Sequence, residues 1–478
     1  MSTNSTLPKG ASRREFLKTT AVAGGLLLLP SGFLRGQNAP SNRITLACIG
    51  VGGQGGHDSQ MLQRGGAQVI GICDVNRRAL QAAKKRNFND ARTFEDYREL
   101  LEKVGDKIDA VSVSTPDHMH FSIAYSAIAL GKHAYVQKPL THTVDQARRL
   151  AKLAAEKGVV TQMGNQGNSK DQIRVLREWY EAGLFGEVTE VVAWTNRPVW
   201  AQGTRVPKYG PEKPVPDWLN WKLWLGAAPY LPFYENLGFK WRGLFAFGTG
   251  ALGDMAAHVL NPANYILGLG LPTEIEVKVR GTSPVAFPDG SAITFTFPKT
   301  ARGGAIKLTW LDGVPGYKQA NRNSQSTVPG KEGGNEAQVA ALAEHGVPEH
   351  VTNGLKDNSG SYFKASGTSF ATGENGDRIV TFPTAKQQEF VAKQIPRKYA
   401  RVPGTNHYNN WLNAIRTGTK ATSDFSYAGK FAEIMLLGVI AQRLGRSLKW
   451  DPVKGEFKND NEANRLVKAP PATDGFLA

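Results

Sequence analysis

The stretch IGVGGQGG, from Ile49 to Gly56, decides the fold of this chain. It follows the apolar, β-branched run RITLACIG (43–50) and precedes HDSQMLQRGG (57–66), which has the composition of a helix and its stop. Strand, glycine loop and helix in this order are typical of a nucleotide-binding turn. Gly50 permits the tight turn, Gly52 lets the backbone approach a pyrophosphate, and Gly55 lets the helix pack on the strand. The helix N-terminus then offers free N–H groups to phosphates.

A second strand, AQVIGICD (67–74), ends in Asp74, which lies 24 residues after Gly50. A carboxylate at this position accepts hydrogen bonds from the adenosine ribose and repels a 2′-phosphate. The predicted cofactor is therefore NAD, with NADP disfavoured. Arg77 and Arg78 lie close enough to weaken that preference.

Strands and helices continue to alternate over the next ninety or so residues. We expect strands at 108–115 and 133–138 and helices at about 117–130 and 144–157. This order predicts an α/β fold with a doubly wound parallel sheet, a Rossmann domain over 42–165, whose ligand lies beyond the carboxyl ends of the strands. The side chains at such ends are Ser114, Thr115, Gln137, Lys138, Asn165 and Gln166.

The second half, 166–452, reads as an α+β domain. Four alternating β-rich runs, at 187–196, 273–281, 291–298 and 304–312, have no long helix pattern between neighbours and predict a large, mostly antiparallel sheet. Late helices are expected at about 407–417 and 426–444. Residues 317–362 are rich in Gly, Asn and Ser and predict a surface insertion, either a plain loop or a lid. Residues 453–478 are expected to be a C-terminal tail.

Length and composition exclude several classes of protein. A chain of 478 residues is expected to form two or more domains, and 41% hydrophobic with 21% charged residues is ordinary for a globular protein. No apolar run in the body is long enough for a membrane span. The net charge of +17 could favour anionic partners, but no dense basic run with interleaved aromatic residues is present, so we expect no nucleic acid partner. Cys48 and Cys73 fall in apolar strands and read as core residues.

The N-terminus carries the segment SRREFLK (12–18), followed by the apolar stretch TTAVAGGLLLLP (19–30). Paired arginines ahead of a modest apolar region are typical of a twin-arginine export signal, predicted here for residues 1–38. The alternative is a disordered basic tail. The signal predicts a periplasmic or secreted protein that is exported already folded.

Three further motifs carry a resemblance to a known family. They are STPDHMH (114–120), VQKPL (136–140) and GALGDMAAH (250–258). Together with the glycine loop they resemble the Gfo/Idh/MocA oxidoreductases over nearly all of 42–452. The resemblance implies a Rossmann domain followed by a domain with a large open sheet that is often used for subunit pairing, so we expect a homo-oligomer, a dimer or a tetramer. Gln137 stands where the family usually has Glu, which leaves the charge balance of the pocket open.

The expected catalytic residues are Lys138, Asp254 and His258. Removing hydride from a carbinol carbon requires a base for the hydroxyl proton and a group that orients the base. Asp254 and His258 lie four residues apart and would share one face of a helix. The resemblance assigns the matching Lys, Asp and His to substrate binding and acid–base work; taken alone, a solvated lysine and a surface Asp–His pair stay open as interpretations. No further ligand stands at metal-site spacing, so no metal is expected.

The remaining predicted site residues fall into two sets. The cofactor-binding set is Gly50, Gly52, Gly53, Gln54, Gly55, Asp74, Arg78, Ser114, Thr115, Pro116, His120, Gln137 and Lys138. The substrate-binding set is Asn165, Gln166, Arg197, Trp241 and Arg242. Tryptophans crowd the segment before Asp254 and suit either sugar stacking or core packing.

These observations favour an exported NAD(P)-dependent oxidoreductase that acts on a hydroxyl or keto group of a sugar, polyol or glycoside and holds its cofactor tightly. Two alternatives stay open. One is a glycosidase that uses NAD for transient oxidation, although the resemblance implies that such members usually depart from Lys-Pro, which is intact at Lys138-Pro139. The other is a non-catalytic sugar-binding protein on the same fold.

Overall fold

The computed structural model describes residues 43–235, 237–316, 334–469 and 475–477, and the predicted export signal lies outside them. No helix within these ranges combines the length and the apolar composition that crossing a membrane requires.

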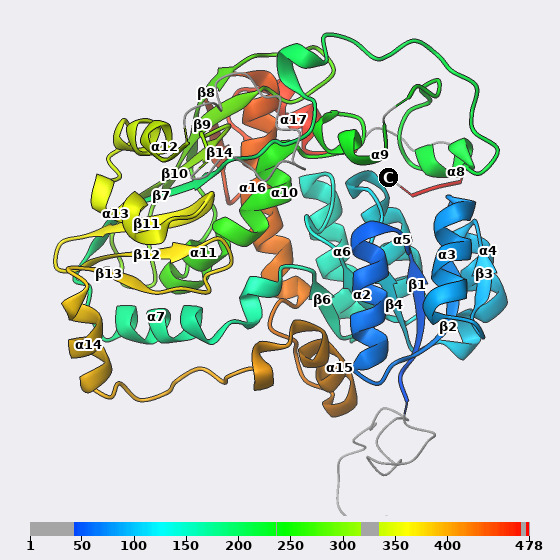
Figure 1. Cartoon of the computed structure of the whole chain (residues 1–478), viewed down its shortest axis with the longest axis horizontal. Coiled ribbons are helices and arrows are strands. Elements are labelled where there is room, and N and C mark those ends of the chain that lie inside the picture. The colour runs from blue at the N-terminus through cyan, green and yellow to red at the C-terminus, as the bar shows by residue number, and fades with distance from the viewer. Residues whose placement is uncertain (1–42, 236, 317–333, 470–474, 478) are drawn as a thin grey trace, which may run out of the picture. The chain divides into compact units, whose positions relative to one another are not determined.

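The first half alternates strands and helices, as the sequence predicts (Figure 1). Its elements are β1 (Thr45–Ile49), α2 (Gly53–Arg64), β2 (Gln68–Cys73), α3 (Arg77–Asn87), β3 (Arg92–Phe94), α4 (Tyr97–Val104), β4 (Ala110–Val113), α5 (Asp117–Ala129), β5 (His133–Val136), α6 (Val144–Lys157) and β6 (Thr161–Met163). The strands form a parallel six-stranded sheet in the order β3-β2-β1-β4-β5-β6. The predicted doubly wound sheet is confirmed.

Both faces of this sheet are buried, which explains why its strands are apolar at successive positions. Neighbouring residues of β1 point to opposite faces. Leu46 and Cys48 pack with residues of α2 and α3 in one cluster, whereas Ala47 and Ile49 pack with residues of α4, α5 and α6 in the other. Cys48 and Cys73 are both buried free thiols, as expected of core residues.

The second half contains the remaining helices and strands. They are α7 (Asp171–Glu181), β7 (Val188–Thr195), α8 (Trp221–Leu225), α9 (Leu237–Lys240), α10 (Gly250–Val259), α11 (Asn261–Leu267), β8 (Glu274–Arg280), β9 (Gly290–Phe297), β10 (Ile306–Asp312), α12 (Gly334–Ala343), α13 (Glu349–Leu355), β11 (Ser359–Ala365), β12 (Ser369–Gly373), β13 (Val380–Phe382), α14 (Ala385–Ala392), α15 (His407–Thr417), α16 (Phe425–Leu444), β14 (Leu448–Asp451), β15 (Glu456–Phe457) and α17 (Asn461–Leu466).

The nine-stranded sheet of this half has the order β13-β12-β11-β7-β10-β9-β8-β14-β15. Only its β7–β10 pair is parallel among the described strands, so the prediction of a mostly antiparallel sheet is confirmed.

Helix α16 joins the two halves (Figure 1). It packs against α6 of the first half and against α10 and β8 of the second. Most of its residues are buried, including Glu433, whose carboxylate accepts a hydrogen bond from Arg148 Nε of α6 at 2.9 Å. One continuous apolar cluster therefore runs from the parallel sheet into the antiparallel one.

Two expectations about irregular segments were wrong in part. Of the predicted insertion, residues 317–333 lie outside the described ranges, but the rest forms α12, α13 and the start of β11, an inner strand of the sheet. Leu342 and Leu355 from these helices pack on Trp194 of β7, so the segment covers the sheet. The predicted tail likewise contains β15, which pairs with β14, and α17.

Replacing Leu355 tests whether α13 is a structural cover. Leu355 is fully buried, so Leu355→Ala is expected to lower the free energy of unfolding by about 2–5 kcal/mol in a urea titration. Val391→Ala on α14 is the control, because Val391 is 62% exposed and its loss should change that free energy by less than about 0.5 kcal/mol. Equal effects of the two variants would contradict the packing of α13.

Candidate active site

A cavity of about 1120 Å³ runs along the carboxyl edge of the parallel sheet. Each strand end contributes to its wall, in the order of the strands. These contributions are Glu95–Tyr97 after β3, Asp74–Asn76 after β2, Gly50 and Gly52–Gly55 after β1, Ser114–Asp117 after β4, Gln137 and Lys138 after β5, and Gln166 after β6. An extended ligand lying in this cavity would cross the whole sheet.

The glycine loop is shaped by close backbone approaches. Gly50 has a φ of +79°, and a Cβ there would lie 2.4 Å from the carbonyl oxygen of Ser114. A Cβ on Gly55 would lie 2.1 Å from the carbonyl oxygen of Gly50. Gly52 and Gly53, by contrast, have no atom closer than 3.5 Å to such a Cβ, so their open sides leave room for a ligand.

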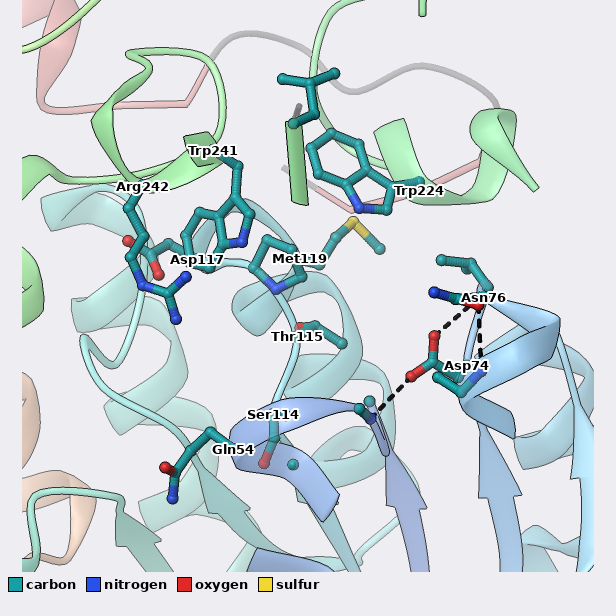
Figure 2. Close-up of a pocket in the computed structure, with 18 of the residues that line it drawn as sticks. Gln54, Asp74, Asn76, Ser114, Thr115, Asp117, Met119, Trp224, Trp241 and Arg242 are labelled. Atoms are coloured by element: carbon teal, nitrogen blue, oxygen red, sulfur yellow. Dashed lines mark hydrogen bonds between the residues drawn. The ribbon is translucent and has the colours of Figure 1, made fainter. Parts of the chain in front are cut away.

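Asp74 is tied to this loop (Figure 2). Its carboxylate accepts hydrogen bonds from the backbone N–H groups of Val51 at 2.9 Å, Gly52 at 3.2 Å and Asn76 at 2.9 Å. Burial raises the pKa of Asp74 above its ordinary value, although these three donors oppose the shift. The loop and the acidic residue thus form one hydrogen-bonded unit.

The cavity fits an NAD dinucleotide. Helix α2 starts at the loop, and its N-cap Gly52 provides no side-chain cap for the first N–H groups. The hydroxyl of Thr115, which lines the cavity, is buried and has no hydrogen-bond partner among the described residues. A helix N-terminus binds phosphates, and an orphan hydroxyl in the wall calls for a polar ligand.

A segment from the second half, residues 213–224, covers the cavity, and we call it the covering segment. Its Leu219 forms a β-bridge with Asn76. Two further backbone bonds flank the bridge, from Arg77 N–H to the Trp218 carbonyl at 2.8 Å and from Asn220 N–H to the Val75 carbonyl at 3.0 Å. The segment is therefore hydrogen-bonded directly beside Asp74.

A partly buried ion pair lies at the other end of the cavity. Lys138 Nζ is 2.7 Å from Asp254 Oδ1 and also donates to the Asp254 carbonyl oxygen at 2.9 Å. Arg242 Nε is 3.4 Å from the same Oδ1. Burial alone would raise the pKa of Asp254, but the charges of Lys138 and Arg242 lower it well below its usual range. Asp254 is therefore a carboxylate across the physiological pH range.

His258 lies one helical turn from Asp254 on α10 and also lines the cavity. Burial, followed by the charge of Lys138, lowers its pKa to about 3. Its Nδ1 is buried without a hydrogen-bond partner among the described residues. The ring is thus a neutral imidazole.

Two aspartates beside the site were not predicted to contribute. Asp117, the first residue of α5, accepts a hydrogen bond at 2.6 Å from Thr249, the N-cap of α10, and burial raises its pKa to about 7. Asp58 is fully buried and accepts hydrogen bonds from Gln137 Nε2 and Ser114 Oγ, both at 2.8 Å. A glutamate at position 137 would place a second carboxylate against Asp58, which explains the amide found there.

The structure brings most of the predicted residues into one cavity wall. They are Gly50, Gly52, Gly53, Gln54, Gly55, Asp74, Ser114, Thr115, Pro116, Gln137, Lys138, Gln166, Arg197, Trp241, Arg242, Asp254 and His258. Arg78, His120 and Asn165 do not line it. The guanidinium of Arg78 lies 5.1 Å from the centre of the Trp218 ring, and Asn165 donates to Asn261 at 3.1 Å.

His120 lies behind the cavity wall and contacts the backbone of two wall loops. Its ring nitrogens lie 2.8 Å from the carbonyl oxygens of Thr115 and Pro139. Burial lowers its pKa to about 4, so the ring is neutral and donates to one of these carbonyls at a time. His120 therefore positions the two loops without facing the cavity.

Several wall residues were missed by the sequence interpretation. They are Tyr97, Asn76, Asp117, Met119, Glu374 and Phe476. Trp224 lies over Met119 in Figure 2, and its ring stacks on Trp221 at 4.7 Å. The only sequence signal for this part of the wall was the crowding of tryptophans before Asp254.

In the described residues, no group of three or more His, Cys, Asp or Glu side chains is arranged to hold a metal ion.

Comparison with protein families identifies the chain. Residues 44–165 match the oxidoreductase family model for the NAD-binding Rossmann fold, and residues 172–305 and 368–474 match the model for the family's C-terminal alpha/beta domain. The chain belongs to the Gfo/Idh/MocA oxidoreductase family. Its first domain is thus the NAD-binding domain of this family, and the family match reaches beyond the expected boundary at 452.

Curated relatives are similar over part of the chain. Levoglucosan dehydrogenase of Pseudarthrobacter phenanthrenivorans is 24% identical over 189 residues, which are 40% of this chain and 40% of that protein. A glycosyl hydrolase family 109 protein of Shewanella sp. (strain MR-4) is 32% identical over 156 residues, 30% of this chain and 33% of that protein. The chain thus spans less than half the length of these relatives.

Solved structures share the fold over a longer range. Levoglucosan dehydrogenase in complex with NADH and levoglucosan aligns with a TM-score of 0.56 at 16% identity, covering 86% of this chain and all of that one. The WlbA dehydrogenase from Bordetella pertussis, in complex with NADH and UDP-GlcNAcA, aligns with a TM-score of 0.55, also at 16% identity, covering 86% and 99% of the two chains.

Replacing Gln137 by glutamate tests its contact with Asp58. Two adjacent buried carboxyl groups cannot both ionise easily, so the pKa of the introduced carboxyl group should rise above its unfolded value. A raised folded pKa contributes stability at low pH that is lost as the pH increases. The free energy of unfolding of Gln137→Glu should therefore fall further below that of the wild type at pH 8 than at pH 5, measured by urea titration.

Gln137→Met is the matched control. It removes the amide without adding a charge, so its deficit should not grow between the two pH values. A pH-independent deficit for Gln137→Glu would show that residue 137 does not sense Asp58.

Proposed function

We propose that this protein is an exported NAD-dependent dehydrogenase-type enzyme that oxidises a hydroxyl group, or reduces the matching keto group, of a sugar, polyol or glycoside. The observation that carries the proposal is the Lys138–Asp254 ion pair, with His258 beside it, at the end of the nucleotide-binding cavity.

Lys138 is arranged to hold a substrate oxygen. An ammonium group has three N–H donors, and the carboxylate and the carbonyl of Asp254 accept two of them. The third remains for a substrate hydroxyl, and the positive charge would stabilise the negative charge that develops on that oxygen as its proton leaves.

His258 is the proton acceptor in this scheme. A base must be neutral to accept a proton, and burial, followed by the charge of Lys138, lowers the pKa of His258 to about 3, so the ring is neutral at physiological pH. The hydroxyl proton passes to His258 as the carbon–oxygen double bond forms. NAD, when bound, would supply the acceptor for the hydride from the same carbon.

The wall around the ion pair suits a polyhydroxylated substrate. Arg197, Glu374 and Gln166 offer hydrogen-bonding groups, and Trp241 offers a ring for stacking. The sugar ligands named for two of the similar structures support the same class of substrate.

The surroundings of Asp74 favour NAD over NADP. Arg77, which could have bound a 2′-phosphate, is paired with Glu95 at 2.6 Å, and the guanidinium of Arg78 lies against Trp218. Asp74 would repel the additional phosphate.

Export would separate this enzyme from the cytoplasmic supply of NAD. The SRREFLK segment supports a route that carries folded proteins. The covering segment, hydrogen-bonded beside Asp74, supports a cofactor that stays bound through many turnovers. The reduced cofactor would then have to be reoxidised in place, either by a second substrate that accepts the hydride or by return of the hydride to the first substrate.

Lys138→Ala should reduce turnover by about 10²–10⁴-fold, because the substrate loses its cationic hydrogen-bond donor. The fold should persist, since Arg242 still neutralises Asp254. Steady-state assays with a panel of sugars and polyols measure the effect, and Lys152→Ala, whose lysine side chain is 78% exposed, is the control. Near-normal turnover of Lys138→Ala would remove Lys138 from the mechanism.

The cofactor should survive purification. Protein isolated from the periplasm, dialysed for a day without nucleotide and then denatured should release nearly stoichiometric dinucleotide, identified as NAD by mass. Picomolar affinity with an ordinary association rate of about 10⁶ M⁻¹s⁻¹ gives a loss rate of roughly 10⁻⁶ s⁻¹, or days. Release of less than about a tenth of an equivalent, with activity restored only by added NAD, would refute retention.

The similarity to glycosyl hydrolase family 109 proteins favours a second candidate, a glycosidase that oxidises its substrate transiently. Such a reaction returns the hydride to the sugar in every cycle. Release of the aglycone from a chromogenic glycoside, without net change in the absorbance of reduced nicotinamide, would support the glycosidase over the dehydrogenase.

A further inference from the structure

The last described residues of the chain, 475–477, lie on the first domain. The ring of Phe476 is 7% exposed and belongs to the main apolar cluster. It also lines the cavity that we assign to the dinucleotide. The chain end therefore contributes a side chain to a pocket that is otherwise built from residues far away in the sequence.

Specific contacts hold this segment in place. The Phe476 ring lies 6.2 Å from the ring of Tyr97, and the guanidinium of Arg98 lies 4.1 Å from the centre of the Phe476 ring. The backbone N–H of Leu477 donates to Ser122 Oγ of α5 at 3.0 Å, and Ser122 also bonds to the Tyr97 hydroxyl at 3.0 Å. The segment thus docks between the first turn of α4 and the second turn of α5.

The order of the strands identifies which part of the dinucleotide lies here. Tyr97 follows β3, at the edge of the sheet, and Asp74 follows the neighbouring strand β2. Lys138 follows β5, on the far side of the glycine loop. If the reacting nicotinamide lies at Lys138 and the adenosine ribose at Asp74, then the adenine base lies toward Tyr97.

We propose that Phe476 is a cofactor-binding residue that packs against the adenine base and retains the dinucleotide. The inference rests on the proposed use of NAD. Purine bases bind to flat apolar rings because their own faces are poorly hydrated and polarisable. Tyr97 and Phe476 form such a surface, while the charged Glu95 and Asp96 line the cavity nearby.

The test measures release of the dinucleotide. Wild-type protein and Phe476→Ala are loaded with NAD during purification, transferred into buffer with excess ADP-ribose, and sampled over time for bound dinucleotide by mass. ADP-ribose prevents rebinding because it occupies the same adenosine site. We expect release from Phe476→Ala to be about tenfold faster or more, the range found when an aromatic ring is removed from beneath a base.

Two further variants distinguish the loss of packing against the adenine base from a general loss of docking of residues 475–477. Leu477→Ala alters an adjacent side chain that is 36% exposed and leaves the backbone bond to Ser122 intact, so release should match the wild type. Phe476→Tyr keeps the ring and should restore slow release. Unchanged release from Phe476→Ala, or equally fast release from Leu477→Ala, would overturn the inference. A wild-type protein that carries no dinucleotide and takes none up would instead refute the proposed function.

Discussion

The ion pair between Lys138 and Asp254 is the constraint on which the rest of the site depends. Its two members come from different halves of the chain, Lys138 from the end of β5 and Asp254 from α10. A buried charge is costly unless it is paired and hydrogen-bonded. The pair therefore exists only when the two halves are docked, and the catalytic geometry and the tertiary structure are stabilised by the same contact.

A second polar group, the buried carboxylate of Asp58 on α2, connects the segments that surround the glycine loop. It accepts hydrogen bonds from Gln54 on its own helix, from Ser114 after β4, from Gln137 after β5 and from Tyr408 on α15. Four donors satisfy a buried carboxylate fully. The Gln137 amide is thus part of a hydrogen-bond network. Where the family usually has Glu, Gln137 donates to the Asp58 carboxylate, which a glutamate could not do.

The features with short-range causes could be predicted from the sequence. Gly55 is required by a backbone approach to the carbonyl of Gly50 within the same loop, and Asp74 ends a strand whose partner β1 is the preceding strand in the sequence. Position at a strand end does not determine where a side chain points, however. Asn165 follows β6 and His120 lies in the first turn of α5, after β4, yet each is turned toward buried polar partners rather than the cavity.

Contacts between distant segments were not predictable in this way. Phe476 reaches Tyr97 across most of the chain length, and no local pattern marks that pairing. The glycine-rich composition around α12 and α13 likewise suggested a loop. Their burial depends on the apolar face of β7, including Trp194, which is distant in the sequence and leaves no local pattern. Such residues are recognisable only once tertiary packing is known.

Helix α16 has a consequence for how small molecules enter and leave. Enzymes with a cleft between two domains commonly open by a hinge. Here a single helix belongs to the cores of both halves, and separating them would expose its buried surface and the carboxylate of Glu433. A hinge motion is therefore disfavoured by the same packing that makes the fold continuous. Local openings of peripheral segments would cost less free energy than separating the two halves, because local opening free energies are smaller than that of unfolding the whole chain. Ligands could in this way bind and leave without disruption of the apolar core that the two halves share.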